Sequence, residues 1–388
     1  MKPEIRRLFD EPLCREGTFC SKWDDRERLF HSKDALPMWV ADMDFRTAPG
    51  VINALVERAQ HGAFGYESYN PAFALAVQGW QMRRHGLHIE TDWLLPSPGV
   101  VDSLYMCVET MSQPEEYVLV NTPLYGPFFS AITGKNRKIF DCPMLYTDGV
   151  WRMDFDRIEE GLKAGSRLFL LCNPHNPVGR VWDKEELIRL IDLCHRYGAR
   201  VVSDEIHSDF IRAGHKHAPI LSLDPTAVQL ISSTKTFNLA AMRYSQIIVA
   251  DKELRSALND ELRKCNASTG IMGRIAQEAA FRTGDEWVDG LNEYLDEARE
   301  MMETFVKNEM PGFELTRSQG TYLLWLDARC LNLSDEDIVK VFVEKAGICP
   351  NRGDFFGENG KGFLRINIAT PHANIRRAME GMAKAFGK

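Results

Sequence analysis

A strand–helix–strand unit in the middle of the chain constrains the fold most. Residues 167–172 (RLFLLC) form an apolar run typical of a buried strand, and a turn-rich segment follows. Across residues 183–198 apolar side chains recur at helical spacing, with Asp183 suited to cap the first turn and Gly198 to end the helix. Residues 199–207 (ARVVSDEIH) return as a strand. This succession predicts a crossover between parallel strands, and hence an α/β sheet.

Other segments extend this sheet. Short apolar runs bounded by turn residues lie at 116–123, 138–143, 228–235 and 245–250. Upstream, Pro71 opens a helix that we predict to continue to about His85 and to stop at Gly86. From about residue 285 the pattern changes to a long charged helix, a hairpin-like pair of strands, a further helix and a last strand. This last part is typical of a separate α+β unit.

The length of the chain favours two domains, because 388 residues exceed what one hydrophobic core usually holds. We expect an α/β fold in which a large three-layer α/β/α domain surrounds a mostly parallel sheet, beside a smaller α+β domain. The predicted large domain spans residues 46–284. The small domain is predicted to be discontinuous, formed by residues 1–45 and 285–388.

Charge and composition exclude several classes of protein. A formal net charge of −8 argues against the basic face that nucleic-acid binding needs. No apolar stretch approaches the length of a membrane span, and charges interrupt the N-terminus where a signal peptide would be apolar. The nine cysteines form neither a C-x-x-C pair nor a zinc pattern. We expect a cytoplasmic protein with no nucleic-acid partner, no membrane partner and no metal.

Side chains capable of chemistry follow several of the predicted strands, and parallel strands gather such residues at one edge of the sheet. They are Tyr125, Asn173, His175, Asn176, Asp204, His207, Ser232 and Lys235. Upstream, Ser-Pro-Gly at 97–99 precedes a helix whose free N–H groups would bind an anion such as phosphate. A phosphate cradle, an aromatic ring, a carboxylate and a lysine are what pyridoxal 5′-phosphate requires.

Nine segments in matching order resemble the fold-type I pyridoxal-phosphate enzymes of the class I/II aminotransferase superfamily. Within it, the chain is similar to the cystathionine β-lyase/C–S lyase branch. Any one segment alone is a weak signal, whereas the ordered set is specific. The segments are PMWVADMDF (37–45), FGYES (64–68), SPGVV (97–101), NTPLYGPF (121–128), CNPHNPVGR (172–180), SDEIHSD (203–209), SSTKTFN (232–238), GTYLLWLD (320–327) and FLRINIATP (363–371).

The resemblance implies a role for each residue around the cofactor ring. Lys235 would bind the cofactor covalently and shuttle protons as the catalytic residue. Asp204 would pair with the pyridine nitrogen, Asn176 would donate to the phenolic oxygen, and Tyr125 would stack on the ring. His207 occupies a position where many aminotransferases carry tyrosine; histidine after D-E-I is familiar in the C–S lyase branch. It is either a cofactor-binding residue or a packed core histidine.

The resemblance also implies how the cofactor phosphate is held. The segment Gly99, Val100 and Val101 would present main-chain N–H groups to the phosphate, helped by the Ser232 hydroxyl. Arg243, eight residues after Lys235, matches the phosphate-binding arginine of aminotransferases. Tyr66 would reach the phosphate of the other subunit, which implies a homodimer with shared active sites.

For the substrate, a small-molecule amino acid, the resemblance assigns its α-carboxylate to Arg365, a bidentate task that lysine performs poorly. Asn176, Val40 and Ala41 would lie beside the substrate. The reaction implied is β-elimination from cystathionine or a related cysteine S-conjugate, which yields a thiol, pyruvate and ammonia. The alternative is an aminotransferase, which Arg243 favours. A non-catalytic protein of the same fold is a third hypothesis, although every cofactor position is intact.

Overall fold

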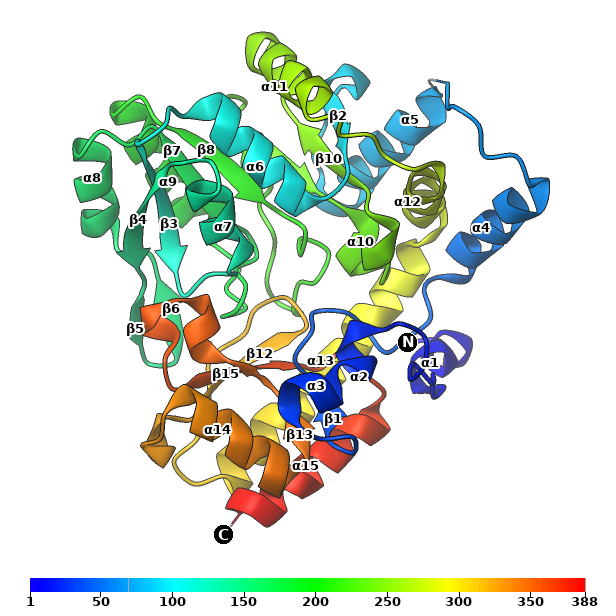
Figure 1. Cartoon of the computed structure of the whole chain (residues 1–388), viewed down its shortest axis with the longest axis vertical. Helices are drawn as coiled ribbons and strands as arrows, with labels where there is room; N and C mark the ends of the chain where they lie inside the picture. Colours follow the sequence, from blue (N-terminus) through cyan, green and yellow to red (C-terminus); the bar gives the residue numbers. More distant parts are fainter. Residues whose placement is uncertain (69, 388) are drawn as a thin grey trace.

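The computed structural model describes residues 1–68 and 70–387. A seven-stranded sheet forms the centre of the upper half in Figure 1. Its strand order is β2 (Leu94–Ser97), β10 (Ser245–Ile248), β9 (Val228–Ile231), β8 (Arg200–Asp204), β7 (Leu168–Cys172), β3 (Tyr117–Thr122) and β4 (Lys138–Pro143). The pairs from β9 to β4 are parallel, whereas β10 runs antiparallel to both of its neighbours. The expected mostly parallel sheet is therefore confirmed.

Helices cover both faces of this sheet because alternate strand residues point to opposite sides. On β7, Leu168 and Leu170 enter one core, while Phe169 and Leu171 enter the other. The first core is covered by α6 (Val100–Met111), α7 (Pro127–Thr133) and α11 (Lys252–Lys264). The second is covered by α5 (Pro71–Trp80), α8 (Phe155–Lys163), α9 (Lys184–Arg196) and α12 (Ile271–Thr283), with α4 (Pro49–His61) packed on α12. These are the three expected layers.

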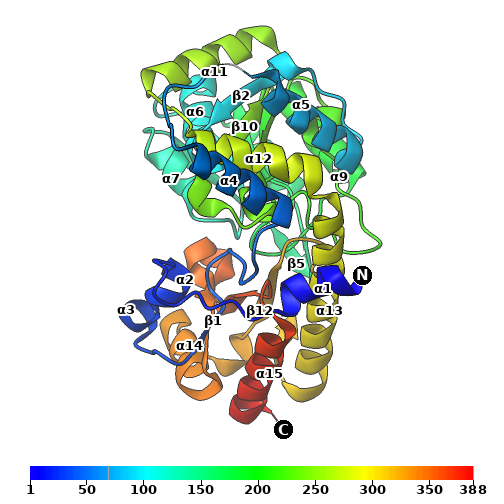
Figure 2. The ribbon, with the colours of Figure 1, turned by 90° about the vertical axis from the view of Figure 1, so that its right-hand side faces the viewer.

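The lower half is built around a four-stranded antiparallel sheet (Figures 1 and 2). Its strand order is β11 (Glu314–Leu315), β12 (Leu323–Asp327), β15 (Phe363–Asn367) and β14 (Asn351–Arg352). The long helix α13 (Asp285–Glu309) reaches from α12 to α15 (His372–Phe386). Further short elements are the helices α1 (Pro3–Asp10), α2 (Ser21–Asp24), α3 (Arg26–Phe30) and α14 (Asp335–Val341) and the strands β5 (Leu145–Thr147) and β6 (Val150–Arg152).

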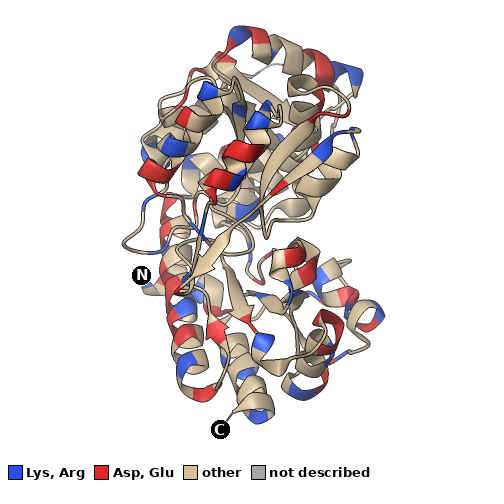
Figure 3. Cartoon of the chain, turned by 90° about the vertical axis from the view of Figure 1, so that its left-hand side faces the viewer, with Lys and Arg blue, Asp and Glu red and all other residues tan. Residues whose placement is uncertain are grey.

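The N-terminal segment returns to this lower half. Strand β1 (Leu36–Pro37) pairs in parallel with β13 (Ile348–Cys349), and α1 packs on α13. Figure 1 shows the same neighbourhood, with the blue N-terminal segment beside the orange and red elements. This pairing supports a discontinuous small domain, although the domain boundaries themselves stay a prediction. Acidic and basic residues are interspersed along the helices of both halves (Figure 3).

Local sequence signals explain the positions that hold functional residues. The crossover helix α9 begins with a capping box in which Glu186 accepts from the main-chain N–H of Asp183 at 3.0 Å. The predicted strand at 228–235 is too long, because Ser232 caps a short helix, α10 (Ser233–Thr236), that carries Lys235.

Within residues 1–68 and 70–387, none of the helices combines the length and the apolar character that a membrane span requires.

Candidate active site

A cavity of about 240 Å³ lies beyond the carboxyl ends of the parallel strands. Most of the residues expected from the sequence line it: Ala41, Gly99, Val100, Val101, Tyr125, Asn176, Asp204, His207, Lys235 and Arg243. The rest of the lining comes from Pro98, Asp102, Phe128, Cys172, Ile206, Thr234, Ala240 and Tyr244. Four of the expected residues lie outside the lining: Val40, Tyr66, Ser232 and Arg365.

Lys235 projects from α10 toward the N-terminal segment. Its Nζ donates to the main-chain carbonyl of Ala41 at 2.7 Å. Desolvation, reinforced by the positive charge of Arg365, lowers the pKa of Lys235 to about 8, while Asp42 and Asp204 oppose the shift. An amine with a pKa this low is partly neutral at neutral pH, so it is available as a nucleophile and as a general base.

Asp204 ends β8 and is buried at the floor of the cavity. Its Oδ1 accepts from the main-chain N–H of Ile206 at 3.0 Å. Burial, reinforced by the nearby Glu205, raises the pKa of Asp204 to about 7, although the hydrogen bond from Ile206 and the charge of Lys235 oppose the shift. A buried carboxyl that accepts so few hydrogen bonds favours a cationic partner. The protonated pyridine nitrogen of pyridoxal 5′-phosphate would be such a partner.

Arg365 reaches the site from the small sheet. It lies in the middle of β15, whose pairing with β12 begins at Phe363. Its guanidinium donates to Asn176 Oδ1 at 3.0 Å and to the Trp39 carbonyl at 2.8 Å. Burial lowers the pKa of Arg365 to about 10. A buried guanidinium bound only to neutral oxygens within the described residues is suited to receive a carboxylate.

Two rings border the cavity near these groups. Tyr125 is half-buried and lies close enough to Arg365 and Asp204 for their charges to affect its pKa, which burial raises. His207 is buried and packs edge-on against Tyr322, with ring centroids 5.7 Å apart. Burial lowers the pKa of His207 well below its usual value, so the imidazole is neutral at physiological pH. Its Nδ1 has no partner within the described residues, so packing alone does not satisfy this histidine.

The opposite end of the cavity is formed by the start of α6. Gly99 precedes the helix in an extended conformation, and within the described chain no side chain caps the free N–H groups that follow. A Cβ on Gly99 would lie 2.7 Å from Asp102 Oδ2, so a side chain here would crowd the opening. Arg243 stands beside it and donates to both Asp102 carboxylate oxygens at 3.2 Å. Main-chain donors and a guanidinium at one helix start favour an anion.

Besides Arg365, three expected residues lie outside the cavity lining. The Ser232 hydroxyl is engaged with the Tyr244 carbonyl at 2.6 Å and caps α10, whereas Thr234 lines the cavity. The available sequence signal is that serine is a preferred N-cap residue, which assigns Ser232 to the start of a helix and leaves the next hydroxyl, Thr234, for the cavity. The Val40 carbonyl accepts from Asn367 at 2.6 Å, while Tyr66 is fully exposed in the single chain. The roles of these residues stay predictions.

The fold and the site together define a class of enzyme. The chain belongs to the family described as aminotransferase class I and II, which matches residues 34–382. Within that family it is similar to the cystathionine beta-lyase PatB of Bacillus subtilis (strain 168), with 38% identity over 380 residues that cover 95% of this chain and 98% of PatB. Protein MalY of Escherichia coli (strain K12) is 32% identical over 97% of this chain and 98% of its own length.

Solved structures support the same assignment. Cystalysin from Treponema denticola, which contains a pyridoxal 5′-phosphate cofactor, matches with a TM-score of 0.93 and 31% identity over 97% of this chain and 98% of cystalysin. The pyridoxal-phosphate-bound C–S lyase of Staphylococcus hominis matches with a TM-score of 0.91 and 29% identity over 97% of both chains. The expected family, its C–S lyase branch and the fold class are confirmed.

Proposed function

We propose that this chain is a pyridoxal-phosphate-dependent C–S β-lyase. It cleaves L-cystathionine or a related cysteine S-conjugate to a thiol, pyruvate and ammonia. The observation that carries the proposal is the convergence of Lys235, Asp204 and Arg365 on one site, in a chain similar over its whole length to enzymes named for this reaction. The geometry suits an amino-acid substrate, because the Arg365 guanidinium lies close enough to the Lys235 amine for its charge to lower the pKa of that amine.

The residues present fit the cofactor. Asp204 is buried, and His207 Nδ1 is a buried atom with no partner among the described residues, so a polar ring would suit both. The start of α6 and Arg243 form an anion cradle at the other end of the cavity. When bound, pyridoxal 5′-phosphate supplies an electron sink for the carbanion at the substrate Cα.

The protein side chains perform the remaining tasks. Arg365 binds the substrate α-carboxylate through two parallel N–H donors and so orients the Cα–H bond. Lys235 would hold the cofactor covalently, and its amine, when free, would remove the Cα proton of the substrate. Asp204 would pair with the ring nitrogen and favour its protonated form. The thiolate then leaves from Cβ, and hydrolysis of the remaining three-carbon unit yields pyruvate and ammonia.

The active unit that we infer is a homodimer with shared sites. Tyr66 is fully exposed in the single chain, and several apolar side chains on the segments that precede and follow it are also exposed: Ile52, Val56, Phe64 and Leu75. Exposed apolar groups on neighbouring segments favour a contact with another protein surface. A shared site would place Tyr66 at the phosphate end of the partner's cavity.

The nine free cysteines favour a reducing compartment, the cytoplasm.

The test is an incubation of the purified, cofactor-loaded protein with L-cystathionine and no added 2-oxo acid. We expect thiol and pyruvate to form in equal amounts through many turnovers. The Lys235→Ala variant, loaded in the same way, provides the background. If neither product forms above that background with cystathionine or with simpler cysteine S-conjugates, the lyase proposal is wrong.

An aminotransferase is the second candidate, and Arg243 is the observation that favours it. Its guanidinium lines the cavity beside the start of α6. The position of Arg243, eight residues after Lys235, matches the phosphate-binding arginine of aminotransferases. The first proton transfer is common to both reactions, so Lys235 and Asp204 serve either. Turnover that requires an added 2-oxo acid, and converts it to an amino acid without releasing thiol, would establish this function instead.

A further inference from the structure

We propose that Tyr322 is a positioning residue for Lys235, acting through the main-chain carbonyl of Ala41. The two side chains meet at that oxygen. It accepts from Lys235 Nζ at 2.7 Å and from the Tyr322 hydroxyl at 3.0 Å. This inference rests on the proposed function, in which the Lys235 amine is released and must be oriented during the proton-transfer step. The Ala41 carbonyl is thus the acceptor that directs the amine when substrate has displaced it.

The direction of this carbonyl is set by its neighbours. Asn367 donates from Nδ2 to the carbonyls of both Val40 and Asp42, each at 2.6 Å. The side chain of Asn238 binds the main chain of Met43 twice, accepting from its N–H at 3.0 Å and donating to its carbonyl at 2.8 Å. Since the residues on either side are held, the Ala41 peptide has little freedom to rotate, and its oxygen stays aimed at the cavity.

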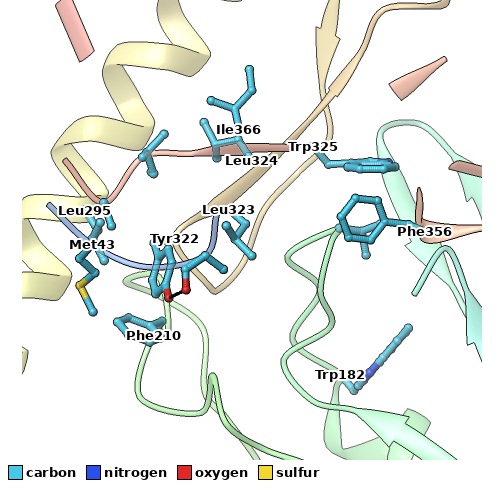
Figure 4. Close-up of a cluster of buried hydrophobic side chains, with 14 of the residues drawn as sticks. Met43, Trp182, Phe210, Leu295, Tyr322, Leu323, Leu324, Trp325, Phe356 and Ile366 are labelled. Carbon is cyan, nitrogen blue, oxygen red and sulfur yellow. Dashed lines mark hydrogen bonds between the residues drawn. The ribbon is translucent and has the colours of Figure 1, made fainter. Parts of the chain in front are cut away.

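Tyr322 is equally well held. Its side chain is fully buried, and its ring packs edge-on against Phe210 with centroids 4.8 Å apart. Figure 4 shows the Tyr322 ring beside Phe210, with Met43 on the neighbouring segment. Burial raises the pKa of Tyr322, so the phenol remains a protonated donor at all working pH values. Because the Tyr322 hydroxyl and the Ala41 carbonyl are both held in place, the Lys235 amine can bind the carbonyl oxygen only from the side that Tyr322 leaves free.

The shared acceptor also affects the charge of Lys235. A carbonyl that already accepts one hydrogen bond stabilises an ammonium less than one that is free. The other groups that face the amine are Arg365, which disfavours its charge, Asp42 and Asp204, which favour it, and the neutral His207. Removing the Tyr322 hydroxyl leaves the carbonyl to the lysine alone, which favours the ammonium and loosens the orientation of the amine.

The first experiment measures Lys235 without any catalysis. The cofactor-free, full-length protein is acetylated with limiting acetic anhydride at a series of pH values, and modification of Lys235 is quantified by peptide mass spectrometry. Tyr322→Phe should move the midpoint for Lys235 upward by about half a pH unit. Tyr294→Phe is the matched control, because Tyr294 is also buried and donates to Asp10 at 2.7 Å, far along the chain from Lys235. A midpoint unchanged in Tyr322→Phe overturns the proposal.

The second experiment uses the cofactor-loaded enzyme. Tyr322→Phe should lower kcat about fivefold, move the acid side of the kcat–pH profile upward and leave KM within about twofold. A raised KM with unchanged kcat, or the same loss of kcat in Tyr294→Phe, overturns the positioning role. Failure of the proposed function is a separate result: the wild-type protein would then release no pyruvate, while the acetylation midpoints would still report on Tyr322.

Discussion

The two ends of the cavity differ in how much of the site one chain completes. At the ring end, Asp204 and Arg365 are 6% and 3% exposed. At the phosphate end, the side chains of Arg243 and Asp102 are 66% and 37% exposed. The buried end draws on β8 and β15, which have packed cores behind them, whereas the exposed end draws on a helix start and a loop. One chain therefore encloses the ring end by itself, whereas we infer that a second chain helps to complete the phosphate end.

The largest effect is expected at the buried end, from Lys235→Ala. The lysine supplies both the covalent attachment and the general base, so we expect kcat/KM to fall by about 10⁴-fold or more. The absorbance band of the covalently bound cofactor should disappear, although cofactor can still bind through its phosphate. Thiol release and absorbance spectra of the reconstituted protein measure both effects. An unchanged cofactor spectrum would contradict the assignment of Lys235.

Arg365→Lys tests whether the same end binds the substrate carboxylate. Lysine keeps the charge but loses the planar pair of donors, so we expect kcat/KM to fall about 100-fold, mainly through a raised KM. Steady-state kinetics with L-cystathionine measure this change. Arg352→Lys is the matched control, since Arg352 lies on the adjacent strand β14 with its side chain half exposed and pairs with Asp354. Equal losses in the two variants would mean that Arg365 has no special role in substrate binding.

A mixture of two variants tests whether the exposed end belongs to a dimer. Tyr66→Ala should weaken cofactor binding about tenfold, the effect of one lost hydrogen bond to a charged group. If sites are shared, a mixed dimer with Lys235→Ala contains one site with an intact Lys235 and an intact Tyr66. Co-expression should then restore about a quarter of wild-type activity at limiting cofactor. Activity equal to the average of the separate variants would show that Tyr66 acts within its own chain or not at all.

The same contrast explains what could be predicted from sequence. The ends of strands are local patterns, so the apolar runs are enough to place Asp204 and Lys235 beside one cavity. The use of each hydroxyl in S-S-T-K depends on helix capping, so the runs alone do not show that Thr234 lines the cavity while Ser232 caps the helix. The contact between Ala41 and Tyr322 joins residues 281 positions apart in different parts of the chain. No local pattern contains it, because it arises only when the N-terminal segment docks beside β12.

The smallest effect is expected from Arg243→Gln. This guanidinium is exposed and shares its charge with Asp102, so solvent screens most of its attraction for a phosphate. We expect the Kd for the cofactor to rise about threefold at low salt and less at high salt, with kcat at saturating cofactor unchanged. Absorbance titrations at two salt concentrations measure this. Asp102→Asn is the opposite control: it removes the competing carboxylate and should tighten cofactor binding. A loss of kcat in Arg243→Gln at saturating cofactor would mean that the exposed end takes part in the chemistry, and the division between the two ends would fail.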